Sequence, residues 1–145
     1  MTSPRRLAVA AGLALVLTTG CSPASHHTSA PPAKQHAGVD SGPRLNAALL
    51  AAVTYVRLWS RPTLTRDAWY AGVRPVVTRA YAQLLADVDP DHVPAHGVTG
   101  SPHLVSAVPA VVVADVPTDA GFIQVTVTDT GGRWLIASAS QTTSP

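Results

Sequence analysis

The spacing of apolar residues changes once along the chain, and this change limits the folds that are open to it. Between residues 45 and 88, apolar side chains recur at three- and four-residue steps, the period of a helix with one buried face. From about Val93 the period falls to two, which is typical of half-buried strands. Helices followed by strands predict an α+β domain rather than alternating βαβ units.

Prolines divide the helical half. Pro43 is a favourable first-turn residue, and it begins a helix that ends by Pro62. A second helix starts near Thr65, a suitable N-cap, and Pro75 breaks or kinks it because proline has no backbone N–H. The first apolar stripe consists of Leu45, Leu49, Ala52, Val53, Val56 and Trp59, and the stripe after the break of Val77, Ala80, Tyr81, Leu84, Leu85 and Val88.

Four strands are expected in the second half. Residues 122–128 alternate Ile123, Val125 and Val127 with polar side chains, as a strand with one buried face does. The other three strands are predicted at residues 103–108, 110–116 and 133–140. We therefore expect N-terminal helices packed on one face of a curved antiparallel sheet of about four strands, over residues 43–140, with a tail at 141–145.

The first 20 residues have the three-part pattern of a secretory signal peptide. Arg5 and Arg6 precede an unbroken run of Ala, Leu, Val and one Gly at residues 7–17, and small residues follow. The run is too short for a spanning helix, which needs about 20 apolar residues. Cys21 is the single cysteine of the chain, so it cannot form a disulfide within it.

The end of this segment resembles a bacterial lipobox, a Leu-Ala/Ser/Thr-Gly/Ala-Cys pattern. Thr19, Gly20 and Cys21 match it, whereas Thr18 stands where the pattern prefers an aliphatic residue. The resemblance implies cleavage between Gly20 and Cys21 and a diacylglyceryl and acyl modification on Cys21, with no other cofactor. Two acyl chains, at about 0.8 kcal/mol per buried CH₂, suffice for stable anchoring. The expected location is the extracytoplasmic face of the cell membrane.

Two other export routes are open. Cleavage after Ala24 would release a soluble protein, although Pro23 makes that site a poor one. The pair of Arg5 and Arg6 would suit twin-arginine export, but Pro4 and Ala8 fit that pattern poorly. We therefore predict export by the general secretory route, with lipidation at Cys21.

Residues 21–42 are expected to be the lipidated cysteine and a disordered tether. The segment is rich in Ser, Ala, Pro and Gly and has no apolar period. As a flexible coil, about 20 residues average roughly 25 Å end to end. His26, His27 and His36 have neither Cys nor a carboxylate cluster beside them, so we interpret them as solvated side chains rather than metal ligands.

The charge balance argues against a nucleic-acid partner. The full chain carries 10 basic and 8 acidic residues, and removal of Arg5 and Arg6 leaves eight of each sign. A neutral domain lacks the electrostatic footprint of nucleic-acid binding. Residues 43–80 nevertheless hold six Arg against one Asp, and residues 81–145 one Arg against six Asp. The two halves either face each other or present a basic docking surface.

Residues 43–140 resemble secreted actinobacterial proteins with a nuclear-transport-factor-2-like, or cystatin-like, cone. The resemblance rests on W-Y-A-G-V-R-P-V-V-T at residues 69–78, D-V-P-T-D-A-G at 115–121 and G-R-W-L-I at 132–136. It implies helices closing a curved sheet. Conjugation and type IV secretion accessory domains share that fold with ketosteroid-isomerase-like and polyketide-cyclase enzymes, so the resemblance implies a fold more than an activity.

No sequence motif defines a catalytic or metal site. G-x-S-x-G, a Gly-rich phosphate loop and metal-ligand spacing are all missing from the sequence. The acidic run at residues 87–91 fails as a calcium loop, because His92 and Val98 replace the Gly and Glu that such a loop needs. Cone enzymes place acid–base groups at the mouth, where the candidates here are Tyr55, Tyr70, Tyr81, His103, Asp115 and Asp129.

Several of these residues have two readings. Strand alternation places Asp129 on the face of Val127, near the core, but Asp is also common at turns such as the one that follows. The tryptophans either fill the core or line a pocket. The candidate pocket residues are Trp59, Trp69, Tyr70, Tyr81, His103 and Asp129, with Trp134 as a third core or pocket indole.

Two function classes follow. The first is a membrane-anchored extracytoplasmic lipoprotein whose non-enzymatic domain docks another protein of the cell envelope, as a conjugation or secretion accessory would. The second is a small-molecule binding module or a cyclase- or isomerase-like enzyme that uses the interior of the cone. An open pocket with a buried Asp or His would favour the second class.

Overall fold

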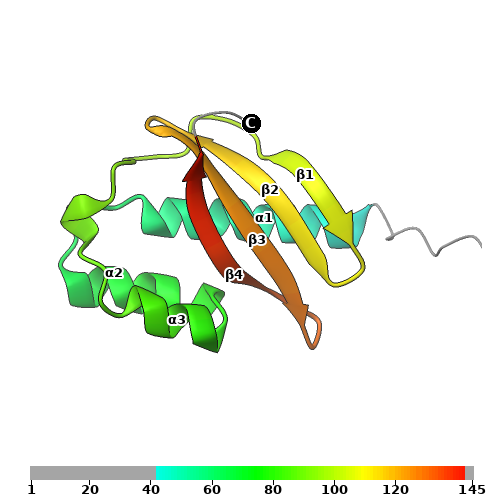
Figure 1. Cartoon of the computed structure of the whole chain (residues 1–145), viewed down its shortest axis with the longest axis horizontal. Helices are drawn as coiled ribbons and strands as arrows, with labels where there is room; N and C mark the ends of the chain where they lie inside the picture. The colour runs from blue at the N-terminus through cyan, green and yellow to red at the C-terminus, as the bar shows by residue number, and fades with distance from the viewer. Residues whose placement is uncertain (1–41, 143–145) are drawn as a thin grey trace, which may run out of the picture. The chain divides into compact units, whose positions relative to one another are not determined.

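The computed structural model describes residues 42–142, where three helices and two short 3₁₀ turns precede one antiparallel sheet (Figure 1). This arrangement confirms the α+β class. The predicted signal peptide, Cys21 and the tether up to residue 41 lie outside the described residues. The elements are α1 (Pro43–Trp59), α2 (Arg66–Val73), η1 (Arg74–Val76), α3 (Arg79–Leu85), η2 (Pro90–His92), β1 (His103–Val108), β2 (Val111–Thr118), β3 (Gly121–Thr130) and β4 (Arg133–Thr142).

Helix α1 begins at the predicted proline and ends at Trp59, before Pro62. The backbone N–H of Ser60 closes its last turn by donating to the carbonyl of Val56. One side of the helix is buried, and it combines small and large residues: Ala48, Ala52, Val53, Tyr55 and Val56. The small residues let the helix lie close to the sheet, and it contacts β2, β3 and β4.

The second helical stretch is divided at Pro75, as predicted. Thr65 Oγ1 accepts from the backbone N–H of Ala68 and begins α2, and Pro75 lies in η1. Thr78 Oγ1 accepts from the backbone N–H of Tyr81 at 3.3 Å and begins α3. Each helix therefore has its own hydroxyl cap, which satisfies one N–H of the first turn.

The predicted apolar stripe after Pro75 is wrong at two positions. Ala80 is exposed and Leu84 has 72% of its side chain exposed, whereas Ala82 and Leu85 are buried. The prediction continued one helical phase from Val77, but Val77 is extended and the helix restarts only at Arg79. The predicted Leu85, Tyr81 and Val88 still pack in or against the core, so only the edge of the buried stripe differs, with Ala82 in place of Ala80 and Leu84.

The four strands form a meander in the order β1-β2-β3-β4, which leaves β1 and β4 at the edges. The hairpin between β2 and β3 pairs Thr118 with Gly121, and that between β3 and β4 pairs Thr130 with Arg133. The pairing is irregular at two places: Val105 of β1 has no partner on β2, and Ala137 of β4 has no partner opposite Thr126 and Val127 of β3. Figure 1 shows the curvature of the sheet, with the helices against one face.

Alternation along the strands separates a core face from an outer face. The core face carries Val112, Ala114, Val116, Ile123, Val125, Val127 and Ile136, all buried. Trp69 of α2 is also fully buried, and its indole N–H donates to the carbonyl of Trp59 at 2.8 Å. This bond satisfies the only polar group of the indole and joins α2 to the end of α1.

A short parallel bridge connects the helical half to the outer edge of β4. Val77 pairs with Ile136, and the backbone N–H of Thr78 donates to the Ile136 carbonyl at 2.8 Å. The bridge occupies part of the edge that β4 would otherwise expose. In residues 42–142, no helix has the length and apolar character needed to span a membrane.

Candidate functional site

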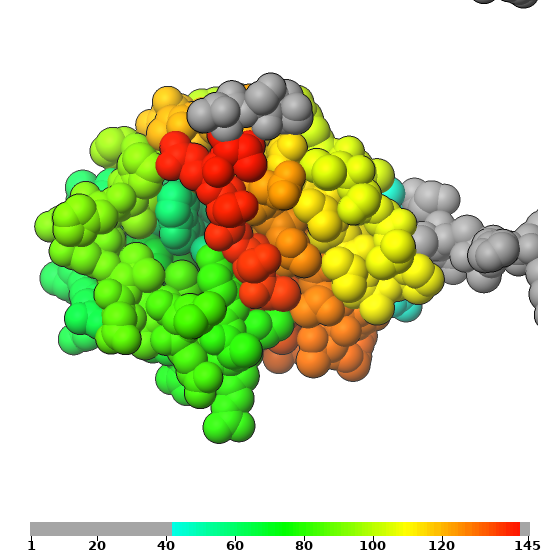
Figure 2. Space-filling model, viewed as in Figure 1, coloured from blue at the N-terminus to red at the C-terminus, as the bar shows by residue number. Residues whose placement is uncertain are grey.

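A small hollow opens between the helices and β4. Figure 2 shows it beside the red atoms of β4, with atoms of α1 at its floor. Its volume is about 100 Å³, and its lining consists of Trp59, Tyr81, Pro94, Ile123, Ala139, Ser140 and Gln141. Ligand pockets usually measure about 300–1,000 Å³. The hollow can therefore admit a few waters or one small group, but not a polycyclic substrate.

Two tyrosine hydroxyls meet beside this hollow. The hydroxyl oxygens of Tyr55 and Tyr81 lie 3.1 Å apart and form a hydrogen bond, with their ring centroids at 6.1 Å. Tyr55 is fully buried, and this burial is the main cause that raises the pKa of Tyr55 well above its usual value. The neighbouring Tyr81 is the second cause, and it acts in the same direction. Tyr55 is therefore a neutral phenol that can donate a hydrogen bond but cannot act as a base.

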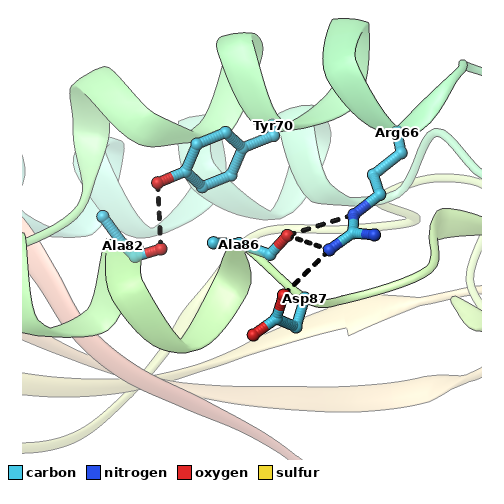
Figure 3. Close-up of polar contacts among 5 residues, drawn as sticks. All are labelled: Arg66, Tyr70, Ala82, Ala86 and Asp87. Atoms are coloured by element: carbon cyan, nitrogen blue, oxygen red, sulfur yellow. Dashed lines mark hydrogen bonds and ion pairs between the residues drawn. The ribbon is translucent and has the colours of Figure 1, made fainter.

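The other aromatic candidates have structural contacts of their own. Tyr70 donates its hydroxyl to the carbonyl of Ala82 at 3.1 Å, across the contact between α2 and α3 (Figure 3). Beside it, the guanidinium of Arg66 donates to the Ala86 carbonyl and to the carboxylate of Asp87, the latter at 3.0 Å. These bonds tie the two short helices together, so Tyr70 contributes to packing and not to the hollow.

His103 and Asp115 lie on the outer face of the sheet. They are register partners on β1 and β2, and the His103 ring is 5.8 Å from that of Phe122. Asp115 is 2% exposed and accepts a hydrogen bond from the Gln124 side-chain amide at 3.1 Å. Because Gln124 alternates with the core residue Ile123, this polar row faces away from the helices and from the hollow.

Asp129 was interpreted either as a side chain near the core face or as a turn residue, and each interpretation describes part of its environment. Its carboxylate caps the following turn by accepting from the Gly132 backbone N–H at 2.7 Å, and it also forms an ion pair with Arg44 of α1. The same guanidinium lies over the ring of Trp134, with 5.8 Å from its central carbon to the ring centroid. No local pattern pointed to Arg44, because its partner is 85 residues away in the chain.

An open groove runs along α1 beside Trp134. Its larger part has a volume of about 310 Å³, and the adjoining part, which shares Ala47 and Trp134, has about 240 Å³. Leu50 in this groove is 63% exposed. The residues that line the two parts are Pro43, Arg44, Ala47, Leu50, Ala51, Thr54, Val76, Asp129, Gly132 and Trp134. We call this surface the α1 groove; among these residues, the sequence had singled out only Asp129 and Trp134 as site candidates.

The edge strand β1 is the second unusual surface. Leu104, Val105 and Val108 are 47%, 51% and 56% exposed, and the strand contains no Asp, Glu, Lys or Arg. Within residues 42–142, β1 pairs with β2 alone, so its other edge presents unpaired backbone groups. Exposed apolar edges are templates for pairing with another chain.

The acidic run before β1 forms a turn. Asp89 accepts from the backbone N–H of Asp91 at 3.1 Å and begins η2, and His92 lies 3.5 Å from the Asp89 carboxylate. Across residues 42–142, no group of three or more His, Cys, Asp or Glu side chains is arranged to hold a metal ion.

The candidate pocket residues are therefore divided among separate places. Trp59 and Tyr81 line the hollow, Trp69 is in the core, Tyr70 joins two helices, His103 is on the outer face and Asp129 is in the α1 groove. Within the described residues, the hollow is lined by hydroxyls and an amide but by no carboxylate or imidazole. A proton acceptor of the kind that acid–base catalysis uses does not face it.

The fold and these surfaces define a small α+β domain with an apolar edge strand and an apolar groove. Comparison of the chain with protein-family models, with curated proteins and with solved structures gave no significant match.

Proposed function

We propose that the protein is an extracytoplasmic lipoprotein, anchored in the cell membrane through Cys21, whose α+β domain docks another envelope protein at β1. The signal-peptide pattern and the lipobox match at Thr19, Gly20 and Cys21 support the anchor. The observation that carries the docking function is the edge of β1, which has no Asp, Glu, Lys or Arg, exposes Leu104, Val105 and Val108, and pairs with no second strand within residues 42–142.

An edge of this kind binds by strand addition. Main-chain hydrogen bonds hold an incoming extended segment, and alternate side chains select its sequence. The edge of β1 is short, because Pro102 and Pro109 flank it and neither has a backbone N–H to donate. The bulge at Val105 interrupts its regular pairing further. The segment that fits is therefore a few residues long and apolar.

A short segment from another protein fits this edge better than a second copy of the chain. A stable dimer buries about 1,200–2,000 Å² in total. The apolar side chains on β1 are Leu104, Val105, Ala107 and Val108, on a six-residue strand, which is too little for such an interface. Strand addition needs less area, because backbone hydrogen bonds supply part of the affinity.

We also propose that the domain is a member of the nuclear-transport-factor-2-like cones, as a conjugation or secretion accessory domain would be. The order of its helices, the break at Pro75 and the curved four-stranded meander support this assignment. The small hollow, lined by Trp59 and Tyr81 and without a carboxylate, favours docking over the cyclase- or isomerase-like alternative.

Photo-crosslinking in intact cells tests the docking function. A photoreactive side chain replaces Val108, and the adduct is measured in three backgrounds: otherwise wild type, Val105→Lys and Leu84→Lys. We expect Val105→Lys to reduce the adduct at least about fivefold, because a charge on the edge blocks strand addition. Leu84→Lys is the matched control, since it also replaces an exposed apolar side chain with lysine, but on α3.

Mass spectrometry of the adduct identifies the occupant. An apolar extended segment of another envelope protein supports the proposal. An adduct of twice the mass of the chain would assign the edge to a second copy and overturn it. So would an adduct that Val105→Lys leaves unchanged, provided that thermal unfolding shows both lysine variants to be folded.

A further inference from the structure

We propose that the α1 groove is the face of the domain that rests on the membrane, against anionic phospholipid headgroups. This inference deepens the proposed function, because it depends on Cys21 being the attachment point. It concerns a different surface from β1 and a different partner, a lipid surface of negative charge.

The groove combines the side chains that membrane interfaces favour. Trp134 lies in both of its parts, and Leu50 is 63% exposed beside it. Tryptophan has an apolar body and one polar N–H, and it is enriched at the headgroup level of bilayers. Ala47, Ala51 and Val76 complete an apolar floor. An exposed patch of this kind on a folded domain marks a binding surface.

Two arginines lie beside this apolar floor, near the end formed by Thr54 and Val76. Arg133 directly precedes Trp134, and its guanidinium reaches across to donate to the carbonyl of Pro75, next to Val76. Arg57 follows Thr54 by three residues on α1, so it continues the same side of the helix. Arg57 and Arg133 are exposed, and within residues 42–142 neither pairs with a carboxylate.

The one acidic side chain in the groove is already neutralised. Asp129 pairs with Arg44, whose guanidinium covers Trp134. The remaining charge on the rim, from Arg57 and Arg133, is positive. Basic side chains close to an anionic leaflet are attracted to it, whereas an acidic residue would be repelled. The charge of this rim therefore complements an anionic bilayer.

The chain enters the domain at the same place. Pro43, the first residue of α1, lines the groove, and the segment from Cys21 reaches the domain directly before it. As the flexible coil that the sequence predicts, a tether of about 20 residues would average roughly 25 Å end to end. The anchor would therefore hold this end of the domain within a short distance of the bilayer. At the resulting effective concentration, a contact that is weak in solution becomes populated.

Fluorescence quenching on vesicles tests this orientation without requiring the cell to acylate the protein. The mature chain from Cys21 is made unacylated and coupled through its single thiol to a maleimide lipid. The vesicles contain either 30% phosphatidylglycerol or phosphatidylcholine alone, with bromines on the acyl chains as short-range quenchers of tryptophan. Coupling supplies the anchor chemically, so failure here is distinguishable from failure of lipidation in the cell.

We expect quenching on the anionic vesicles that is lost in Trp134→Phe, because Trp69 is buried and Trp59 faces the hollow. Arg57→Gln and Arg133→Gln should each weaken the binding of the α1 groove to the anionic vesicles about fivefold. Arg66→Gln is the matched control: it removes the same charge at the contact between α2 and α3, outside the groove (Figure 3). It should leave the quenching unchanged.

Three results would overturn the proposal. The first is equal quenching on phosphatidylcholine alone, which would remove the role of charge. The second is quenching that persists in Trp134→Phe, which would place another tryptophan at the bilayer. The third is no quenching on either vesicle, which would leave the α1 groove to a protein occupant.

Discussion

At the scale of single residues, Asp119 holds a segment that has little secondary structure of its own. Its carboxylate accepts from the backbone N–H groups of His96 and Gly97, at 2.9 and 3.3 Å, and its own N–H donates to the Gly97 carbonyl. Thr99 adds a backbone bond to Pro117. The approach to β1 is thereby fixed to the hairpin between β2 and β3.

This arrangement predicts a specific dependence of stability on pH. The hydrogen bond from His96 is the main cause that lowers the pKa of Asp119 below its usual value of 3.8. Its contribution to stability is therefore present above that value and is lost as the pH falls through the lower folded pKa. We expect Asp119→Asn to flatten the loss of stability below about pH 4. Urea unfolding at a series of pH values measures this effect.

Asp67→Asn is the control for that series. Asp67 is an exposed carboxylate in the first turn of α2, and the variant makes the same change in charge away from the loop. If both variants had the same acid dependence, Asp119 would have no special role in it.

Local signals predicted some of the single-residue roles. The Thr65 cap and the turn at Asp129 were predictable because each depends on residues within three positions. The ion pair of Asp129 with Arg44 and the bond from Trp69 to Trp59 were not, because they form only when separate elements pack together. The spacing of residues along the sequence does not show which elements will pack together.

At the scale of elements, the hairpin between β2 and β3 depends on one backbone conformation. Gly121 has a φ of +104°, and a Cβ there would lie 3.3 Å from the carbonyl oxygen of Thr142. Such a φ is costly for any residue with a side chain. The hairpin also uses the Thr118 hydroxyl, which donates to the Gly121 carbonyl at 2.7 Å. Gly121 therefore fixes the pairing of the two central strands.

Gly121→Ala should lower the free energy of unfolding by about 1–3 kcal/mol, the usual cost of a strained backbone conformation. Gly97→Ala is the matched control, because Gly97 has no positive φ and a Cβ there meets nothing within 4 Å. It should change stability by less than about 1 kcal/mol. Chemical unfolding of the two variants compares them, and equal stabilities would contradict the role of Gly121.

The helices and strands themselves were largely predictable, but the exact limits of the side that a helix buries were less so. The break at Pro75 follows from proline chemistry, β3 from period-two alternation, and β2 from a nearly continuous run of β-branched residues. On α3 the prediction was right for Leu85 and for the partly buried Tyr81 and was wrong for Ala80 and Leu84, which are exposed. The exact edge of a buried stripe depends on where the helix restarts after η1, which a periodic pattern does not specify.

At the scale of the whole molecule, the proposed attachment predicts where the protein is found. Wild-type protein should be in the membrane fraction, with the mass of a diacylglyceryl group and an acyl chain on Cys21. Cys21→Ala should lack that mass, because the thiol is the site of modification. Ser22→Ala, one residue further on, should retain it. Intact-mass spectrometry of both variants decides, and a wild-type protein without the added mass would contradict the anchor.

The hollow and the α1 groove could not be predicted from the sequence. The hollow takes its lining from α1, α3, the segment after η2, β3 and β4, and the groove joins α1, η1, β3 and β4. Each surface exists only where helices and sheet meet. The sequence did indicate some of the participants, because Trp59, Tyr81 and Trp134 are large aromatic residues in a chain that has few of them.

The packing of α1 also bears on the order in which the domain can fold. Its buried side lies against β2, β3 and β4, and β4 further contacts α3 and η1. Contacts between the first and last elements form late, because the intervening chain must close a long loop first. A chain that crosses a membrane from its N-terminus would therefore travel as an unfolded polymer until β4 arrives. Its native shape would be acquired on the far side, with the C-terminal strand completing the core.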